Sequence, residues 1–298
     1  MLKEDDLITI RRHLHQIPEV ALEEVETHAF LMQVIGMMDQ KFLKILEPKE
    51  LPTAILVRVQ GSDPSRTIGY RTDIDGLPVD EKTGLPYASQ HPGKMHACGH
   101  DTHITILLGA AKVLAAMKDQ LTVTVRFLFQ PAEEEIANSG AAYMKEEPLV
   151  KECDRLIALH IWSKIPAGWA SLRYGPVMSA ADTFDVTVEG RGGHGALPHQ
   201  TVDPIVAGAE FVTALQTVVS REVNPLEPAV LSITQFQGGT TSNVIPGEAH
   251  LAGTARTFSK ELRDAYPGIL ERVAQGVSTA TRAKLRTCLL YTSPSPRD

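Results

Sequence analysis

The chain has 298 residues, of which 43% are hydrophobic and 22% are charged, and 29 Lys and Arg against 36 Asp and Glu give a net charge of −7. This length is sufficient for about two domains with substantial cores, and the composition is typical of a folded globular protein rather than a disordered one. The negative charge and the lack of a basic stripe disfavour nucleic-acid binding.

No segment predicts membrane insertion or secretion. Lys112 interrupts the longest apolar candidate, residues 104–117, and a membrane helix needs roughly 18 uncharged residues. The acidic N-terminus is not followed by the apolar core of a signal peptide. Three cysteines, Cys98, Cys153 and Cys288, cannot form a disulfide framework. We therefore expect a cytoplasmic protein that binds neither membrane nor nucleic acid.

The first part of the chain alternates between helical and strand-like segments. Apolar residues recur at helical spacing in some segments and form short continuous runs in others. These patterns predict helices at residues 6–15, 22–37 and 104–117 and strands at 53–60, 67–74, 122–129 and 156–161. The alternation indicates an α/β sheet with active residues at the ends of its strands.

The pattern changes near residue 180. The sequence predicts a strand at residues 183–188, a glycine-rich turn at 190–195 and a long amphipathic helix at 203–221. Two strands at 230–236 and 249–256 and a second helix at 260–284 follow. This order is typical of a compact α+β unit, so we expect one domain at 1–180 and another at 181–285. Residues 287–298 lack periodicity, and we interpret 286–298 as a tail outside both domains.

The densest chemical signal is a histidine-rich segment. A 13-residue window of this chain should hold about 0.5 histidine, yet residues 91–103 hold four, with a cysteine and an aspartate. Cys98 and His100 are two residues apart, so in an extended segment both side chains leave the same face. A thiolate and an imidazole suit zinc or a related divalent ion. A polar loop with a buried cysteine is the alternative.

Carboxylates and a histidine also follow three of the predicted strands. Glu133 and Glu134 come directly after one strand, and adjacent glutamates can divide metal binding from proton transfer. Asp73 and Asp75 lie at the end of another strand, where a carboxylate could orient a metal-binding histidine through its second ring nitrogen. His160 follows a third strand. The alternatives are a solvated acidic run and a structural histidine.

The ends of parallel strands meet at one edge of a sheet, so these groups and the histidine-rich segment should converge there. A mixture of Cys, His and Glu ligands beside free carboxylates indicates hydrolysis by metal-activated water. The sequence therefore predicts a metal-dependent hydrolase.

The segments that carry these residues resemble the M20 family of metallopeptidases and amidohydrolases, in its amidohydrolase branch, up to about residue 285. The matching segments are RRHLHQIPE at 11–19, YRTDIDGLP at 70–78, MHACGHDTH at 95–103, FQPAEE at 129–134, ALH at 158–160, GRGGHGALPH at 190–199 and NVIP at 243–246. Several of these are specific alone, and they occur in the family's order. The resemblance implies an α/β catalytic domain with a mainly parallel sheet and an inserted α+β lid domain.

The resemblance also implies roles for the candidate residues of the first domain. Glu133 matches the general base, which takes a proton from water and delivers it to the leaving amine. Asp73 matches an active-site carboxylate that supports a metal ligand. Two divalent ions, whose identity could be zinc, manganese, cobalt or nickel, would be held by residues that match the family's ligands, Cys98, His100, Glu134 and His160.

The second domain matches the family's lid, which also pairs subunits into homodimers. His194 matches a histidine that reaches the partner's active site and stabilises the oxyanion; an ordinary loop histidine is the alternative. Asn243 and Arg256 match positions that bind the carboxylate of the substrate, a contact suited to a planar guanidinium.

Within the family, TIGYRTDIDGLP, GKMHACGHD and SREVNPL are most similar to enzymes that deacetylate N-acetyl-LL-diaminopimelate, giving LL-diaminopimelate and acetate in lysine biosynthesis. A sister amidohydrolase acting on hippurate or other N-acyl-L-amino acids is the alternative. The family's catalytic domain resumes after the lid with a further ligand histidine, which residues 286–298 do not match. We therefore expect a C-terminally truncated chain, for which a catalytically incompetent fragment is a second alternative. We also expect the lid's final strand to be absent, leaving one sheet edge unpaired.

Overall fold

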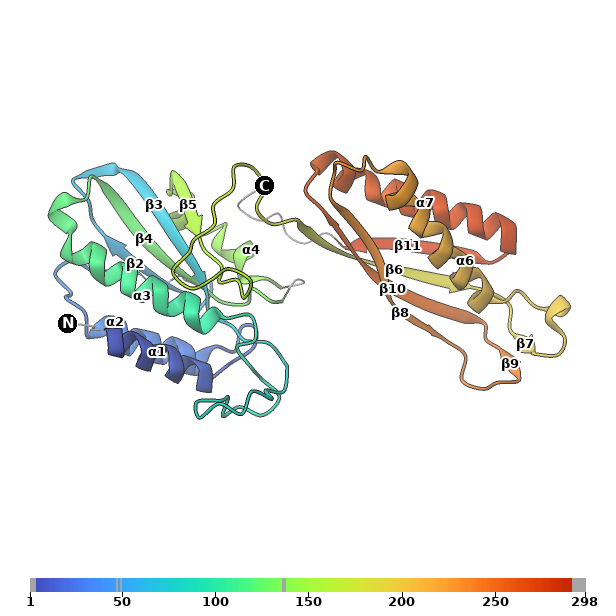
Figure 1. The fold of residues 1–298 in the computed structure, drawn as a ribbon, viewed down its shortest axis with the longest axis horizontal. Coiled ribbons are helices and arrows are strands. Elements are labelled where there is room, and N and C mark those ends of the chain that lie inside the picture. Colours follow the sequence, from blue (N-terminus) through green and yellow to red (C-terminus); the bar gives the residue numbers. More distant parts are fainter. Residues whose placement is uncertain (1–3, 47, 49, 136–137, 291–298) are drawn as a thin grey trace. The chain divides into compact units, whose positions relative to one another are not determined.

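The computed structural model describes residues 4–46, 48, 50–135 and 138–290 and divides into two compact units, Met1–Ser171 and Leu172–Asp298 (Figure 1). The division falls after residue 171, before the boundary expected near 180. Each unit has a hydrophobic core of its own, which is the physical basis of a domain. Among the helices described, none has an apolar stretch long enough to cross a bilayer.

The first unit contains a five-stranded sheet in the order β1-β2-β4-β3-β5. β3 pairs in parallel with β4 and β5, whereas β2 pairs antiparallel with β4 and β1. The expected α/β class is confirmed, but the sheet is mixed rather than mainly parallel, because β2 runs opposite to both of its neighbours, β1 and β4. The strands are β1 Lys44–Leu46, β2 Ile55–Val59, β3 Asp63–Asp73, β4 Val123–Gln130 and β5 Arg155–Ala158.

Three long helices cover one face of this sheet (Figure 1). Leu14, Leu31 and Leu107, one from each helix, are buried in a core that includes Phe127 of the sheet. On the opposite face, Leu128 packs in a smaller cluster with two short helices nearby. The helices are α1 Glu4–Gln16, α2 Val25–Gly36, α3 His100–Ala116, the 3₁₀ turn Lys118–Gln120, α4 Gly140–Met144 and α5 Pro148–Lys151.

Helix α3 begins at His100, four residues earlier than its apolar pattern predicts. Gly99 precedes it with a φ of 98°, a left-handed conformation that favours glycine. A Cβ atom at this position would lie 2.3 Å from a side-chain carbon of Ile161. This turn places His100 at the first position of the helix, two residues after Cys98, which lies at a bend.

The second unit is an antiparallel sheet, in the order β11-β6-β10-β8, with two helices on one face (Figure 1). Phe184, Phe211 and Tyr266 are fully buried between sheet and helices. The elements are β6 Ala180–Glu189, β7 Gly193–His194, the 3₁₀ turn Pro198–Gln200, α6 Pro204–Thr217, the π-helical turn Val218–Glu222, β8 Ala229–Gly238, β9 Val244–Ile245, β10 Glu248–Thr257, α7 Lys260–Thr281 and β11 Lys284–Leu290.

Strand β11 corrects the expectation that this sheet lacks its final strand. It pairs antiparallel with β6 over its whole length, from Lys284 opposite Glu189 to Leu290 opposite Thr183. Leu285 and Leu289 alternate toward the core of the unit. This alternation of side chains begins at residue 284, whereas the tail was expected to begin at 286. The assumed boundary therefore falls inside the strand, and neither part alone is long enough to show the period of two. The remainder of the expected tail, residues 291–298, lies outside the described residues.

Gly253 provides a test of packing in the second unit. It lies in β10 opposite a β-bulge in β8, where Thr234 is the extra residue. A Cβ atom at position 253 would lie 2.3 Å from the carbonyl oxygen of Ser232 and 2.5 Å from the ring of Phe184. Gly253→Ala should lower the free energy of unfolding by about 1–3 kcal/mol through overpacking, measured by urea denaturation. Ala252→Ser, next to it and partly exposed, is the control and should change little. An unchanged unfolding midpoint for Gly253→Ala would contradict this packing.

Candidate metal centre

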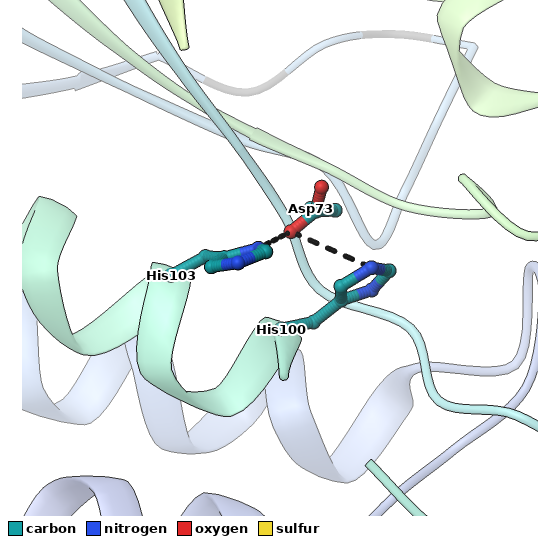
Figure 2. Close-up of side chains that lie close together, drawn as sticks. All are labelled: Asp73, His100 and His103. Atoms are coloured by element: carbon teal, nitrogen blue, oxygen red, sulfur yellow. Dashed lines mark hydrogen bonds and ion pairs between the residues drawn. The ribbon is translucent and has the colours of Figure 1, made fainter. Parts of the chain in front are cut away.

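The candidate site lies where three parallel strands end. Asp73 at the end of β3 is opposite Gln130 at the end of β4, and Arg71 is opposite Ala158 at the end of β5. Two glutamates follow β4 within four residues, and a histidine follows β5 by two. Helix α3 begins at the same edge, and Figure 2 shows His100 and His103 pointing from it toward Asp73. The sheet topology therefore gathers these groups from distant parts of the sequence.

His100 is the central residue of the site, and its side chain is 1% exposed. Its Nδ1 atom lies 2.8 Å from the backbone carbonyl oxygen of Asp75, to which it donates. Its Nε2 atom lies 3.7 Å from Glu134 Oε1 and 3.8 Å from carboxylate oxygens of both Glu133 and Asp73. The carbonyl of Asp75 thus orients the imidazole ring, and the other ring nitrogen, Nε2, points toward three carboxylates.

The residue behind His100 is Asp75, and the role expected for Asp73 stays a prediction. The ligand candidate His100 is supported through its second nitrogen by Asp75, not by Asp73. Asp75 also accepts a 2.9 Å hydrogen bond from the backbone N–H of Glu134. Its position two residues after Asp73 was the only sequence signal for it, and the sequence could not distinguish the two aspartates.

The other two predicted ligands lie together beside this group. Cys98 Sγ is 3.3 Å from His160 Nε2. One ligand atom each of Cys98, His100 and Glu134 lies within 4.8 Å of the others. The structure therefore brings all four predicted metal ligands into one cluster.

The donor set fits a divalent metal ion. Within the described chain, His100 Nε2 and Glu134 Oε1 are buried and have no hydrogen-bond partner. A buried polar atom without a partner is costly, and a cation between these atoms would remove the cost. Thiolate, imidazole and carboxylate together suit zinc and neighbouring transition metals. A second possible group, which adds His103 and Asp73 to His100, is less suitable because those two side chains already bond each other at 2.7 Å.

The electrostatics of the cluster also favour a cation. Burial disfavours the charged imidazolium, but the polar interactions with Asp75 and Cys98 and the negative charge of Asp73 outweigh it and raise the pKa of His100 to about 11. The negative potential that holds this proton would also attract a divalent ion, which competes with the proton for Nε2.

The two carboxylates nearest His100 differ in their surroundings. Burial opposes ionisation of Asp73, but the hydrogen bond from His103 and the charge of Arg71, whose Nη1 lies 2.8 Å away, lower its pKa below the usual range. Loss of hydration raises the pKa of Glu133, an effect that Arg71 partly opposes. The Glu133 side chain remains 39% exposed. A carboxylate with a raised pKa that still meets water suits proton transfer.

Glu24, which the sequence did not single out, holds the turn that presents the two glutamates. Its Oε1 atom accepts hydrogen bonds from the backbone N–H groups of Ala132 at 2.8 Å and Leu22 at 3.1 Å, and its Oε2 atom accepts one from the Thr53 hydroxyl. Ala132 directly precedes Glu133 and has a φ of 50°, which is unfavourable for alanine. The fully buried Glu24 side chain stabilises this conformation.

The three remaining candidates lie in the second unit, at two separate places. His194 of β7 pairs with Val244 of β9, and Asn243, adjacent to β9, accepts a 2.8 Å backbone hydrogen bond from Gly195. Arg256 lies near the other end of β10, eight residues after its first residue, which corresponds to roughly 27 Å along a strand. The structure thus brings His194 and Asn243 together within the unit, but not Arg256.

Comparison with known proteins gives consistent results. The family described as Peptidase family M20/M25/M40 matches residues 69–272. A protein from Limosilactobacillus fermentum named N-acetyldiaminopimelate deacetylase is 46% identical over 93% of this chain and 72% of its own length. A Geobacillus stearothermophilus protein named N-acyl-L-amino acid amidohydrolase is 43% identical over 92% and 73%. A crystal structure from Bacillus subtilis, described as a dinuclear metal-binding peptidase of the M20 family, superposes with a TM-score of 0.82 at 35% identity, over 99% of this chain and 75% of that one.

Substitution of Glu24 tests the turn before the glutamates. Glu24→Ala removes the acceptor for two backbone N–H groups, and each donor left without a partner costs about 1–3 kcal/mol. The free energy of unfolding in urea should fall accordingly. Glu23→Ala, at the exposed neighbouring position, should change it by less than about 0.5 kcal/mol. Equal effects of the two variants would show that Glu24 does not hold this turn.

Proposed function

The chain belongs to peptidase family M20, and we propose that it is a metal-dependent amide hydrolase that removes the acetyl group from N-acetyl-LL-diaminopimelate. The observation that carries the proposal is the convergence of Cys98, His100, Glu134 and His160, with orphaned ligand atoms on His100 and Glu134. The name of the relative from Limosilactobacillus fermentum supports the substrate. The products would be LL-diaminopimelate and acetate, a step of lysine biosynthesis.

The residues of the cluster divide the work of hydrolysis. Cys98, His100, Glu134 and His160 would hold two divalent ions, which when bound supply polarisation of the amide carbonyl and a lowered pKa for the attacking water. The description of the Bacillus subtilis structure as dinuclear supports a pair of ions. Zinc, manganese, cobalt and nickel are all compatible with these donors.

Glu133 serves as the general base. Its carboxylate takes a proton from the attacking water and returns it to the amine nitrogen as the C–N bond breaks. The raised pKa of Glu133 brings it nearer to neutrality, which favours both transfers. Asp73, held ionised by Arg71 and His103, keeps a fixed negative charge beside His100.

The second unit would supply contacts to the substrate as a lid and dimerisation domain. We propose that Arg256 binds the substrate carboxylate; its Nη1 atom is fixed by the backbone carbonyls of Asp182 and Ala255. His194 would stabilise the oxyanion in the active site of a partner subunit, with Asn243 beside it. Arg256 lies far from His194 and Asn243 within the unit, which supports this division of roles. One end of the unit could then contribute Arg256 to one active site, and the other end could contribute His194 to the active site of the partner subunit.

Hydrolysis of other N-acyl-L-amino acids is the second candidate. It is favoured by the Geobacillus stearothermophilus relative, which carries that name at nearly the same identity. The two candidate functions use the same metal centre. They differ in the part of the substrate far from the amide, which is a second amino-acid head in diaminopimelate and another side chain in other N-acyl-L-amino acids.

Paired substitutions of the two glutamates test the division of roles. Glu133→Gln keeps the shape of the side chain but removes the base, so metal content should persist while the hydrolysis rate falls by about 10²–10⁴-fold. Glu134→Gln should instead weaken metal binding. Elemental analysis and an acetate-release assay measure the two effects separately. If both variants kept metal and full activity, the assignment would be wrong.

A substrate comparison tests the specificity. Diaminopimelate has a second amino-acid head at its far end, and loss of one charge-assisted contact costs about 1.5–3 kcal/mol, roughly 10–150-fold in kcat/KM. N-acetyl-LL-diaminopimelate should therefore be preferred by about that factor over N-acetyl-leucine and hippurate. A preference for either of these would favour the second candidate, while the amide-hydrolase proposal would stand.

A further inference from the structure

His103 links two parts of the site without being one of the proposed ligands. It lies on α3 one turn after His100 and is 2% exposed. Its Nδ1 atom is 2.7 Å from Asp73 Oδ1, and its Nε2 atom accepts a 3.0 Å hydrogen bond from the backbone N–H of Ile161. Because Nε2 accepts, the ring proton must be on Nδ1, which donates to Asp73 (Figure 2).

The hydrogen bonds continue from Ile161 to a proposed metal ligand. The Nδ1 atom of His160 donates to the backbone carbonyl of Ile161, so its Nε2 atom presents a lone pair toward Cys98. The rings of His103 and His160 also meet edge to face, with centroids 4.6 Å apart. The pairing of β5 with β3 ends at Ala158 and does not reach this segment. His103 therefore anchors a backbone that the sheet leaves unsupported.

We propose that His103 is a positioning residue that fixes the ring orientation and tautomer of His160 through the backbone of Ile161, and that Asp73 in turn fixes His103. Partners of this kind behind a ligand set which nitrogen faces a metal ion, and their loss typically lowers metal affinity by about 10–100-fold. The inference about metal affinity rests on the proposed metal centre, whereas the inference about the His160 tautomer concerns the metal-free protein alone.

Two substitutions separate the two hydrogen bonds of His103. The amide nitrogen of His103→Asn can replace Nδ1 and donate to Asp73, but the side chain is too short to accept from Ile161. The amide oxygen of His103→Gln can reach the position of Nε2 and accept from Ile161. If the proposal is correct, Asn should release His160 and Gln should preserve its orientation, although Gln lacks the imidazole ring.

The test is ¹⁵N NMR of the histidine rings in the metal-free protein at mildly alkaline pH. In the unmodified chain, His160 should show the two well-separated nitrogen shifts of a single Nδ1–H tautomer. In His103→Asn these shifts should move toward each other as the tautomers mix, and in His103→Gln they should remain apart. An unchanged His160 in His103→Asn, or equal averaging in both variants, would overturn the proposal.

Titration with Zn²⁺ by competition against a chelator gives the second readout. Affinity should fall by about 10–100-fold in His103→Asn and less in His103→Gln. Leu108→Ala is the matched control: Leu108 lies on the same helix and is fully buried, so the variant should lower the urea midpoint of unfolding without changing the His160 tautomer or the affinity for Zn²⁺. An equal loss of affinity in the control would make His103 merely structural.

If the unmodified chain bound no metal, the proposed function would fail, and the NMR result would still decide the role of His103.

Discussion

The parallel pairing of β3 with β4 and β5 is the constraint on which the candidate metal centre depends. It places the carboxyl ends of three strands at one edge, so Asp73 at the end of β3, the glutamates after β4 and His160 after β5 converge although the three strand ends are far apart in sequence. A shift of one residue in either register would turn alternate side chains to the other face of the sheet. The mixed character of the sheet does not disturb the site, because the antiparallel strands β1 and β2 lie on the other side of β4.

Burial of charge around this edge is balanced by pairing. Asp101, next to His100, is fully buried, and it is contacted by Arg11 at 2.9 Å and His15 at 2.7 Å, both from α1. Asp73 is paired with Arg71 and His103 in the same way. Isolated buried charges cost several kcal/mol each, so this pairing is needed for the fold as well as for the chemistry. By contrast, His100 Nε2 and Glu134 Oε1 are among the buried atoms of the described residues that have no hydrogen-bond partner, and both are suited to a cation.

The N-terminal segment has a supporting role in this arrangement. Its helix α1 contributes Arg11 and His15, and the turn after it contributes Glu24, which fixes the strained backbone at Ala132. The site is therefore held from behind by residues that are far from it in sequence and that do not themselves face the metal position. Such buried support limits the motion of Glu133 and Glu134, which suits groups that must keep a fixed geometry.

The sequence by itself determined the α/β class, the main helices and strands, and the identity of the chemical groups. Cys98, His100, Glu133 and Glu134 could be found because unusual residue types cluster at fixed spacing beside apolar runs. Strand β11 was missed because its alternating pattern is short and crosses the boundary that we assumed between the second domain, ending at 285, and the tail, beginning at 286. The sequence predicted that Asp73 or Asp75 could support a metal-binding histidine, but not which of the two lies behind His100. The roles of Glu24 and His103 could not be predicted, because each acts through a backbone or side-chain partner that only the tertiary structure brings near. Sequence spacing reports the local period of the chain, whereas hydrogen bonds between distant segments depend on strand register and helix placement, and these are decided when the whole core packs.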